Sequence, residues 1–423
     1  MADPIIRKVY VLYTGGTFGM KKNKDGRLIP QDLETLKDFI INHTILYVRN
    51  PGESEDFVRK RIVTKDGFIT LYHQLADDDP ETKGKLHKIL YKMEALEPPI
   101  DSSSITPEHW RQMAEKIKDN KHDFDGFVII HGTDTMAFTS SALSFILWDI
   151  KKTVIVTGSQ MPIFHPRTDG IDNFVGSMLM AGYFSNREEM QQVMLYDLNK
   201  LYMGNRVVKC DCDSFSVFDS PDVYPLASLE TTIKLISAKI SLKKAQPKDS
   251  LSVKRMFTKK ENPQVRILRF FPGITEEYVS GVLNGAAGVI LETYGNGNVP
   301  EFEWLKTLLL KADKNVLMLN CTQVYRGTVL PIYQASEILT KANVISGYDI
   351  TPEAALTKMI WTLKSYNNTE TIRKILEHSV CGESCAPPIS GTHRWHQPQP
   401  SSERYVYSLC LQESDMSNKQ QCN

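Results

Sequence analysis

Short apolar runs recur along the chain, and each is followed by a cluster of glycine and small polar residues. Three of these runs lie in the first half, at residues 9–13, 127–130 and 154–156, and two lie in the second half, at 289–291 and 316–319. Continuous apolar runs of this length indicate strands buried on both faces, which occur in parallel sheets covered by helices. We therefore expect a buried, mainly parallel sheet.

Helix signals lie between the apolar runs. Thr106 has the character of an N-cap, and Pro107 follows at the first helical position before an amphipathic stretch over residues 108–117. Thr351 and Pro352 repeat this arrangement further on. The alternation of strands and helices predicts an α/β protein, in which ligands bind at the carboxyl ends of parallel strands. The polar clusters fall at those ends.

The alternation breaks at residues 226–263, a lysine-rich stretch that also contains proline. We predict a larger N-terminal domain at 1–225, with a parallel-rich sheet flanked by helices, and a smaller C-terminal α/β domain at 264–385. Residues 226–263 would be the linker. Residues 386–423 are rich in Ser, Pro, Gln and Asn, and this composition predicts a flexible tail.

The composition narrows the class of protein. The chain has 423 residues with 50 basic and 50 acidic side chains, so it has no overall charge that would attract nucleic acid or an anionic membrane. It holds no apolar run of the roughly 20 residues that a membrane helix needs. Seven cysteines, an odd number, suit reduced thiols better than disulfides and lack zinc-site spacing. The amino terminus does not resemble a signal peptide, so we expect a cytoplasmic protein. From the cysteine spacing we expect no structural metal.

The first polar cluster reads Thr14-Gly15-Gly16-Thr17 and directly follows the first apolar run. Paired glycines permit a sharp turn and a close approach of a ligand to the main chain, which leaves Thr17 on an exposed loop. The spacing differs from the dinucleotide fingerprint G-x-G-x-x-G. From these residues alone, a ligand site and a simple tight exit from the strand are equal alternatives.

The second polar cluster reads His131-Gly132-Thr133-Asp134-Thr135 and follows the second apolar run. Asp134 offers an anionic acceptor for a substrate ammonium group, and Thr133 offers a hydroxyl that can attack or relay a proton. The structural alternative is helix capping, since Thr and Asp are good N-cap residues.

Lys209 follows Gly204-Asn205-Arg206-Val207-Val208 and on its own has the features of an ordinary surface lysine. Lys209 would become a candidate catalytic residue if the fold brought it beside the two polar clusters. A desolvated lysine can lose its proton near neutral pH and act as a base toward a hydroxyl.

Two signatures in this order resemble those of the bacterial-type L-asparaginase family, namely TGGT after the first strand and HGTDTMAFTSSALSF after a later one. The cytoplasmic type I branch is the more similar one, through IVTGSQ and the Asp-Ser-Ser segment at residues 101–103. The resemblance extends over about residues 8–385. It implies that Thr17 is the nucleophile. It further implies a second catalytic set, formed by Thr133, Asp134 and Lys209. The substrate's amino-acid head group would be bound by Asp101, Ser102 and Ser103, together with Thr133 and Asp134.

The resemblance also implies an activity. The expected reaction is hydrolysis of L-asparagine to L-aspartate and ammonia through an acyl-enzyme, without a metal or organic cofactor. A homodimer or homotetramer is expected, with the active site completed at a subunit contact. Two alternatives remain open: a relative that acts on glutamine or another amide, and a non-catalytic amino-acid sensor.

One departure from the family pattern affects the expected site. Many bacterial members carry Gly-Tyr-Ile-Pro after TGGT, whereas residues 26–30 of this chain read Gly-Arg-Leu-Ile-Pro. The tyrosine hydroxyl would then have to come from elsewhere. Tyr333 is the first candidate for this catalytic role, because it follows Gly327-Thr328-Val329 in a segment that resembles a family segment near the site, and Tyr294 is the second. The alternative is that both tyrosines merely pack.

Overall fold

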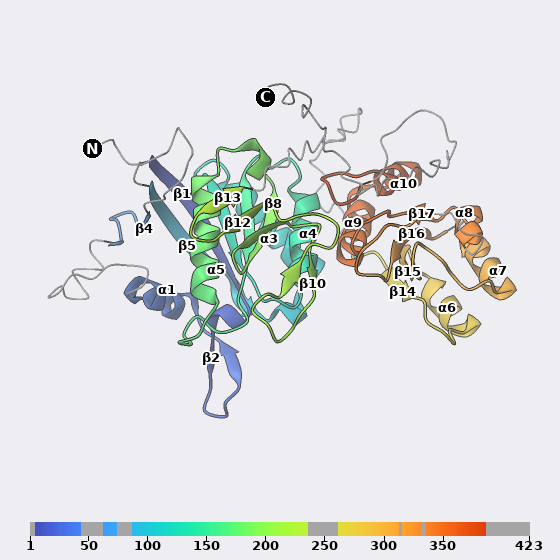
Figure 1. The fold of residues 1–423 in the computed structure, drawn as a ribbon, viewed down its shortest axis with the longest axis horizontal. Coiled ribbons are helices and arrows are strands. Elements are labelled where there is room, and N and C mark those ends of the chain that lie inside the picture. The colour runs from blue at the N-terminus through green and yellow to red at the C-terminus, as the bar shows by residue number, and fades with distance from the viewer. Residues whose placement is uncertain are drawn as a thin grey trace, which may run out of the picture.

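The chain forms two α/β units that lie side by side along the long axis of the molecule (Figure 1). The structure, a computed structural model, describes residues 5–43, 62–73, 87–235, 261–312, 315–330 and 336–385. Each unit has its own sheet, and the N-terminal sheet is the larger one. The predicted fold class is therefore confirmed.

In the described residues the N-terminal unit contains a long mixed sheet and two short two-stranded sheets. Its strands are β1 (Ile5–Gly15), β2 (Met20–Lys22), β3 (Leu28–Pro30), β4 (Ile69–His73), β5 (His87–Ile100), β6 (Gly126–Ile130), β7 (Thr153–Thr157), β8 (Val193–Asp197), β9 (Lys200–Met203), β10 (Val208–Lys209), β11 (Phe218–Asp219), β12 (Ala227–Leu229) and β13 (Ile233–Leu235). Its helices are α1 (Leu33–Asn42), α3 (Pro107–Asn120), α4 (Met136–Ile146) and α5 (Gly170–Tyr183).

The order of the strands places the predicted polar clusters at one edge of the sheet. Within the described residues the order is β13-β12-β9-β8-β7-β6-β1-β5-β4. Strands β5, β1, β6, β7 and β8 run parallel to one another, whereas β4, β9, β12 and β13 pair in the antiparallel sense. Because β1 and β6 are parallel neighbours, the loops that follow them emerge together.

Strand β1 shows why its apolar run is continuous. Val9, Val11 and Tyr13 pack into the cluster that includes α5 and α1 on one face of the sheet. Tyr10 and Leu12 pack into the cluster that includes α3 and α4 on the other face. Successive side chains of a strand point to opposite faces, so a strand covered on both sides needs apolar residues at every position.

The C-terminal unit has a parallel sheet with the order β14-β15-β16-β17 in the described residues. Its strands are β14 (Val265–Arg269), β15 (Gly288–Thr293), β16 (Leu317–Thr322) and β17 (Ile345–Ser346). Its helices are α6 (Glu276–Leu283), α7 (Glu303–Ala312), α8 (Glu337–Lys341), α9 (Pro352–Ser365) and α10 (Thr369–Glu377). Thr351 caps α9 by accepting a hydrogen bond from the backbone of Ala354, as the Thr-Pro pattern predicts.

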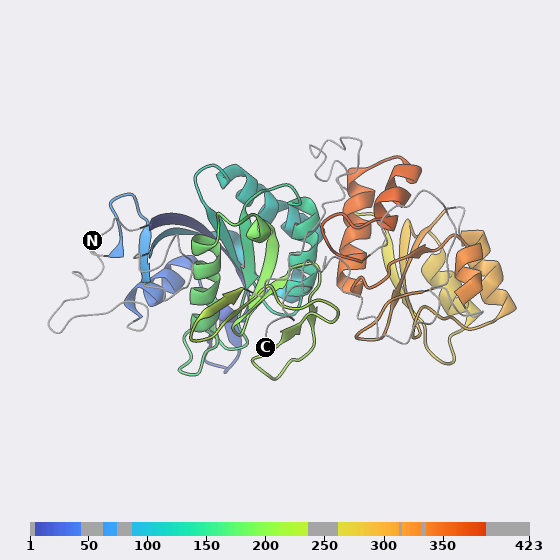
Figure 2. The same cartoon turned by 45° about the horizontal axis from the view of Figure 1, so that its top comes forward.

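The two units meet where α9 lies beside α4, which both views show (Figures 1 and 2). Trp361 of α9 stacks on Phe145 of α4 with 5.8 Å between the ring centroids. Trp361 belongs to the same apolar cluster as α3 and α4, so the junction is a continuation of the N-terminal core. The C-terminal unit is thus packed against the larger unit and is not merely tethered to it.

The start of the predicted linker is corrected by the sheet. Strands β12 and β13 lie within residues 226–263, yet β12 pairs with β9 and so extends the large sheet. Leu226, Ala227 and Leu229 are buried there, which holds this segment in the N-terminal unit. Residues 236–260 of the predicted linker and the predicted tail at 386–423 lie outside the described residues.

Candidate active site

Three loops meet at the carboxyl edge of the large sheet. A methyl group placed on Gly16 would collide with the backbone of His131 and Gly132, and one placed on Gly132 would collide with the side chain of Ser102. The main chains of the loops after β1 and β6 are therefore in direct contact, with the loop after β5 beside them. Gly16 has a φ of 78°, a value that side chains rarely allow, so glycine is needed there both for conformation and for space.

Thr17 lies at this meeting point. It is the first residue of a short 3-10 helix, Thr17–Gly19, and Gly16 is the residue before it. Thr17 is half-buried, while the neighbouring Phe18 is fully buried and packs near Phe174 of α5. Phe18 and the Gly16 contact together hold Thr17 at the edge of the sheet.

Lys209 connects the second loop to a hairpin from another part of the chain. Its Nζ donates hydrogen bonds to Thr133 Oγ1 at 3.0 Å and to Asp134 Oδ1 at 2.7 Å. The Thr133 residue is 6% exposed, whereas the side chain of Asp134 is 63% exposed. A buried hydroxyl beside an ammonium group, with a carboxylate open to solvent, is an arrangement that can transfer protons and bind a cationic substrate group.

The Asp-Ser-Ser segment completes the predicted set. Ser102 is buried, and its backbone carbonyl accepts a hydrogen bond of 2.7 Å from Thr135 Oγ1 in the second loop. Asp101 and Ser103 are exposed, and the Asp101 carboxylate accepts from both the backbone and the hydroxyl of Ser103. The structure thus brings the segment at 101–103 against the loop that carries Thr133 and Asp134.

Gln160 is a site residue that the sequence reasoning did not assign. Its Oε1 accepts a hydrogen bond of 3.3 Å from Thr133 Oγ1, and its Nε2 is buried without a partner among the described residues. Asp169, at the start of α5, holds the Gln160 loop by accepting from the backbone N–H groups of Gln160 and Met161. The available signal was the TGSQ segment, which ends a buried strand next to β6.

A buried hydrogen-bond chain supports the second loop from behind. Trp110 Nε1 donates to Thr139 Oγ1, which lies 3.0 Å from His131 Nε2, and His131 Nδ1 lies 2.7 Å from the carbonyl oxygen of Gly132. Burial lowers the pKa of His131 to about 4, so the ring is neutral near pH 7. A neutral ring can donate through one nitrogen and accept through the other, which fixes the Gly132 peptide.

Asp197, at the end of β8, anchors the hairpin that carries Lys209. Its carboxylate accepts from the backbone N–H groups of Val217 and Phe218, and Phe218 pairs with Lys209 in the β10–β11 ladder. Asp197 is 5% exposed, and burial raises the pKa of this carboxyl to about 6 despite the two hydrogen bonds, which act in the opposite direction. The protein therefore holds a carboxylate in an environment that disfavours its charge.

We expect the Asp197→Asn variant to gain stability relative to the wild type above pH 6, by roughly 1–3 kcal/mol. Folding raises the pKa of Asp197, so the folded chain binds the proton more tightly than the unfolded chain. The wild type therefore loses stability as the pH rises from about 4 to about 6. The Asp197→Asn variant has no carboxyl group at this position and does not show this loss. Urea unfolding of both proteins across this range measures the effect. A difference in unfolding free energy that does not change with pH would contradict it.

The first tyrosine candidate, Tyr333, lies outside the described residues. The second candidate, Tyr294, lies just after β15, where it packs against the apolar cluster of the C-terminal unit. Within the described residues no hydrogen bond joins Tyr294 to Thr17.

The fold and the site together define a two-domain α/β protein with a hydroxyl–lysine site at the carboxyl edge of its larger sheet. Residues 8–241 match the family model described as asparaginase, N-terminal, and residues 264–376 match the glutaminase/asparaginase C-terminal domain. The chain belongs to the asparaginase family.

Individual relatives agree with this assignment. L-asparaginase 1 of Escherichia coli K12 is 32% identical over 89% of this chain and 98% of its own length. The human 60 kDa lysophospholipase is 34% identical over 90% of this chain, which spans 62% of that protein's length. The crystal structure of L-asparaginase I from Vibrio cholerae superposes with a TM-score of 0.67 at 29% identity, covering 89% of this chain and 99% of that one.

No helix in the described part of the chain is long and apolar enough to cross a membrane. Nor do the described residues bring three or more His, Cys, Asp or Glu side chains together in a way that could hold a metal ion.

Proposed function

We propose that the chain hydrolyses L-asparagine to L-aspartate and ammonia, with Thr17 as the nucleophile. The hydroxyl of Thr17 attacks the side-chain amide carbon, ammonia leaves, and water then cleaves the acyl-enzyme ester. Thr133 and Lys209 move the protons, and Asp134 binds the α-ammonium group of the substrate. The segment at residues 101–103 binds the rest of the amino-acid head group.

The observation that carries this proposal is the convergence of the loops that hold these residues. Gly16 packs on Gly132, and Lys209 Nζ lies 3.0 Å from Thr133 Oγ1. A neutral hydroxyl is a weak nucleophile and needs a base within reach as well as donors for the oxyanion. Backbone N–H groups of the two glycine-flanked loops are the candidate donors. Family membership adds the substrate class, since relatives named L-asparaginase match most of the chain.

A substrate panel tests the activity. We expect ammonia release from L-asparagine with a kcat/KM at least about tenfold above that for L-glutamine, since one extra methylene in a fitted pocket costs about that much. A preference for glutamine would support a glutaminase instead. Because the human relative bears the name lysophospholipase, the panel includes lysophosphatidylcholine, with released fatty acid as the readout. Binding of aspartate without turnover of any of these compounds would support a sensor.

Trapping the intermediate tests the mechanism separately. Hydroxylamine competes with water for an acyl-enzyme, so asparagine and added hydroxylamine should give the β-hydroxamate of aspartate. If formation of the acyl-enzyme limits the rate, the total rate of ammonia release should stay constant while the product is divided between aspartate and its hydroxamate. If hydrolysis of the acyl-enzyme limits it, hydroxylamine should raise the rate of ammonia release. Direct attack of water on the amide would give no hydroxamate.

The remaining parts of the proposal concern context. We expect a homodimer or homotetramer that acts without a metal or organic cofactor, as the family resemblance implies. The odd number of cysteines suits reduced thiols and therefore the cytoplasm. Tyr333 remains our candidate for the missing loop tyrosine. Light scattering of the purified chain gives the oligomeric state, and activity after dialysis against a chelator tests the metal-free reaction.

A further inference from the structure

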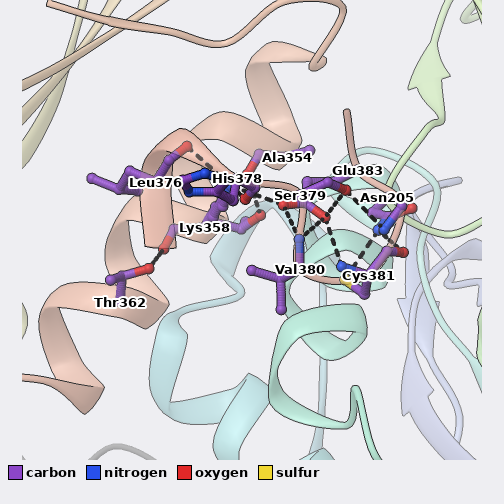
Figure 3. Close-up of polar contacts among 12 residues, drawn as sticks. Asn205, Ala354, Lys358, Thr362, Leu376, His378, Ser379, Val380, Cys381 and Glu383 are labelled. Atoms are coloured by element: carbon purple, nitrogen blue, oxygen red, sulfur yellow. Dashed lines mark hydrogen bonds and ion pairs between the residues drawn. The ribbon is translucent and has the colours of Figure 1, made fainter. Parts of the chain in front are cut away.

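A buried ion pair fixes a turn at the end of the C-terminal unit, residues 379–385, which we term the seam turn (Figure 3). Lys358 of α9 lies 2.8 Å from Glu383, and the two side chains are 1% and 0% exposed. Lys358 Nζ also donates to the carbonyl oxygens of Leu376 and His378. The Glu383 carboxylate accepts from the backbone N–H groups of Val380 and Cys381. Since both charges are hydrogen-bonded as well as paired, the seam turn has a single well-defined conformation.

The seam turn contacts the N-terminal unit at two consecutive residues. Asn205 Nδ2 donates to the carbonyl oxygen of Cys381 at 3.0 Å, and Arg206 Nε donates to that of Gly382 at 2.6 Å. Figure 3 shows Asn205 reaching the turn beside Cys381. Gly204, just before, is held on the opposite side, where its carbonyl oxygen accepts from Ser140 Oγ of α4. The segment that leads to Lys209 is therefore held between the two units.

Arg206 also forms a buried ion pair with the C-terminal unit. Its guanidinium lies 3.0 Å from the carboxylate of Asp349, with side chains 4% and 11% exposed, and it also donates to Cys385 Sγ. Asp349 in turn accepts from the backbone N–H of Cys385. A planar guanidinium with partners on its Nε and on both terminal nitrogens has little freedom to move.

Only two residues separate this anchor from Lys209. The carbonyl oxygen of Arg206 accepts from Ser220 Oγ, Val207 is fully buried, and β10 then pairs with β11. The C-terminal unit reaches the same hairpin again through Tyr325, whose hydroxyl lies 2.6 Å from the Asp219 carboxylate on β11. Lys209 thus contacts Thr133 from a hairpin that the C-terminal unit contacts twice, at Arg206 just before β10 and at Asp219 of β11.

We propose that Arg206 is a positioning residue for Lys209, held in place by the seam turn and Asp349 of the C-terminal unit. The inference rests on the proposed function and adds a reason why the second unit is needed for it. An error of about 1 Å in the placement of a reacting group can cost about a hundredfold in rate. A freed Arg206 would let the hairpin shift by that order while the sheet beneath it stays folded.

The Arg206→Met variant of the full-length chain tests the proposal. We expect kcat for asparagine to fall about 30- to 100-fold while KM changes by less than about threefold, because the groups that bind the head group lie on other loops. Arg206→Lys, which keeps the charge but not the fork of donors, should recover part of the loss. The matched control is Trp361→Leu, which weakens the junction of the units at Phe145. Phe145 is ten positions beyond Thr135, or about 15 Å further along α4, so this change lies away from the site.

A double-mutant cycle separates positioning from general damage. If Arg206 acts through Lys209, then adding Arg206→Met to Lys209→Ala should lower kcat no further than Lys209→Ala alone. Additive losses overturn the proposal, as does a loss in Arg206→Met no larger than in Trp361→Leu at a temperature where both are folded. Should Arg206→Met fail to fold, the pair Arg206→Met with Asp349→Asn removes both charges and keeps an acceptor for Cys385.

The two levels of inference fail differently. A wild-type chain without ammonia release from asparagine, or an unimpaired Lys209→Ala variant, removes the proposed function or the role of Lys209. A fully active Arg206→Met variant beside an inactive Lys209→Ala variant removes only the positioning role. The same coupled ammonia assay measures all of these proteins.

Discussion

The Thr17→Ala variant should release ammonia from asparagine about a thousandfold or more slowly than the wild type at saturating substrate. Removal of the nucleophile in an acyl-transfer enzyme leaves only the contribution of substrate binding and of the oxyanion donors. The side chain is half-buried at the surface of the site, and its neighbour Phe18 holds the local fold, so the unfolding transition should be nearly unchanged. Steady-state ammonia release and thermal unfolding measure the two effects.

A conservative change provides the control for this position. Thr17→Ser keeps the hydroxyl and should retain measurable turnover as well as hydroxamate formation in the presence of hydroxylamine. Thr17→Ala should lose both. An alanine variant that keeps more than about a tenth of the wild-type kcat would remove Thr17 from the mechanism. Such a result would mean that the Thr17 hydroxyl makes no interaction that is specific to the transition state.

The second large effect is expected for Thr133→Val, which keeps the shape of the side chain and removes only its hydroxyl. That hydroxyl lies between Lys209 Nζ at 3.0 Å and Gln160 Oε1 at 3.3 Å, so the change breaks the connection between the lysine and the site. We expect kcat to fall about 100- to 1,000-fold, in the range that general acid–base groups contribute. Steady-state kinetics with asparagine give kcat and KM separately.

A neighbouring threonine offers the matched comparison. Thr135 belongs to the same loop, but its hydroxyl bonds to the backbone carbonyl of Ser102 and not to Lys209. Thr135→Val should therefore affect kcat much less than Thr133→Val does. Equal losses in the two valine variants would show that a disturbed loop, and not a missing proton relay, explains the result.

The fold was well predicted because its signal is carried by each strand alone. Tyr10 and Val11 face different helical layers, so burial on both faces is already visible as an unbroken apolar run. The segment at 226–235 lacked that signal. Ala227 and Leu229 are buried there, but serine lies between them and glutamate, threonine and lysine follow, as is usual near a solvent-exposed sheet edge. The chain therefore resembled a linker where it forms β12 and β13.

The site was predictable to the extent that its residues follow strands. Thr17 and Thr133 follow neighbouring parallel strands, and the pattern alone predicted that both clusters lie at the carboxyl ends of strands. Lys209 was assigned through the family resemblance, since its position depends on a two-residue pairing with Phe218 that no local pattern announces. Gln160 and Arg206 were not assigned at all, because their roles come from tertiary contacts with Thr133 and Asp349.

The seam turn has a consequence for the order of events during synthesis. Its residues leave the ribosome last among those described, after the whole large sheet has been made. Domains fold as they emerge, so the loop that carries Thr17 can be in place while Arg206 still waits for its partners. If Arg206 positions Lys209 as proposed, a chain that ends before residue 379 would hydrolyse asparagine slowly, and the full rate would require the seam turn.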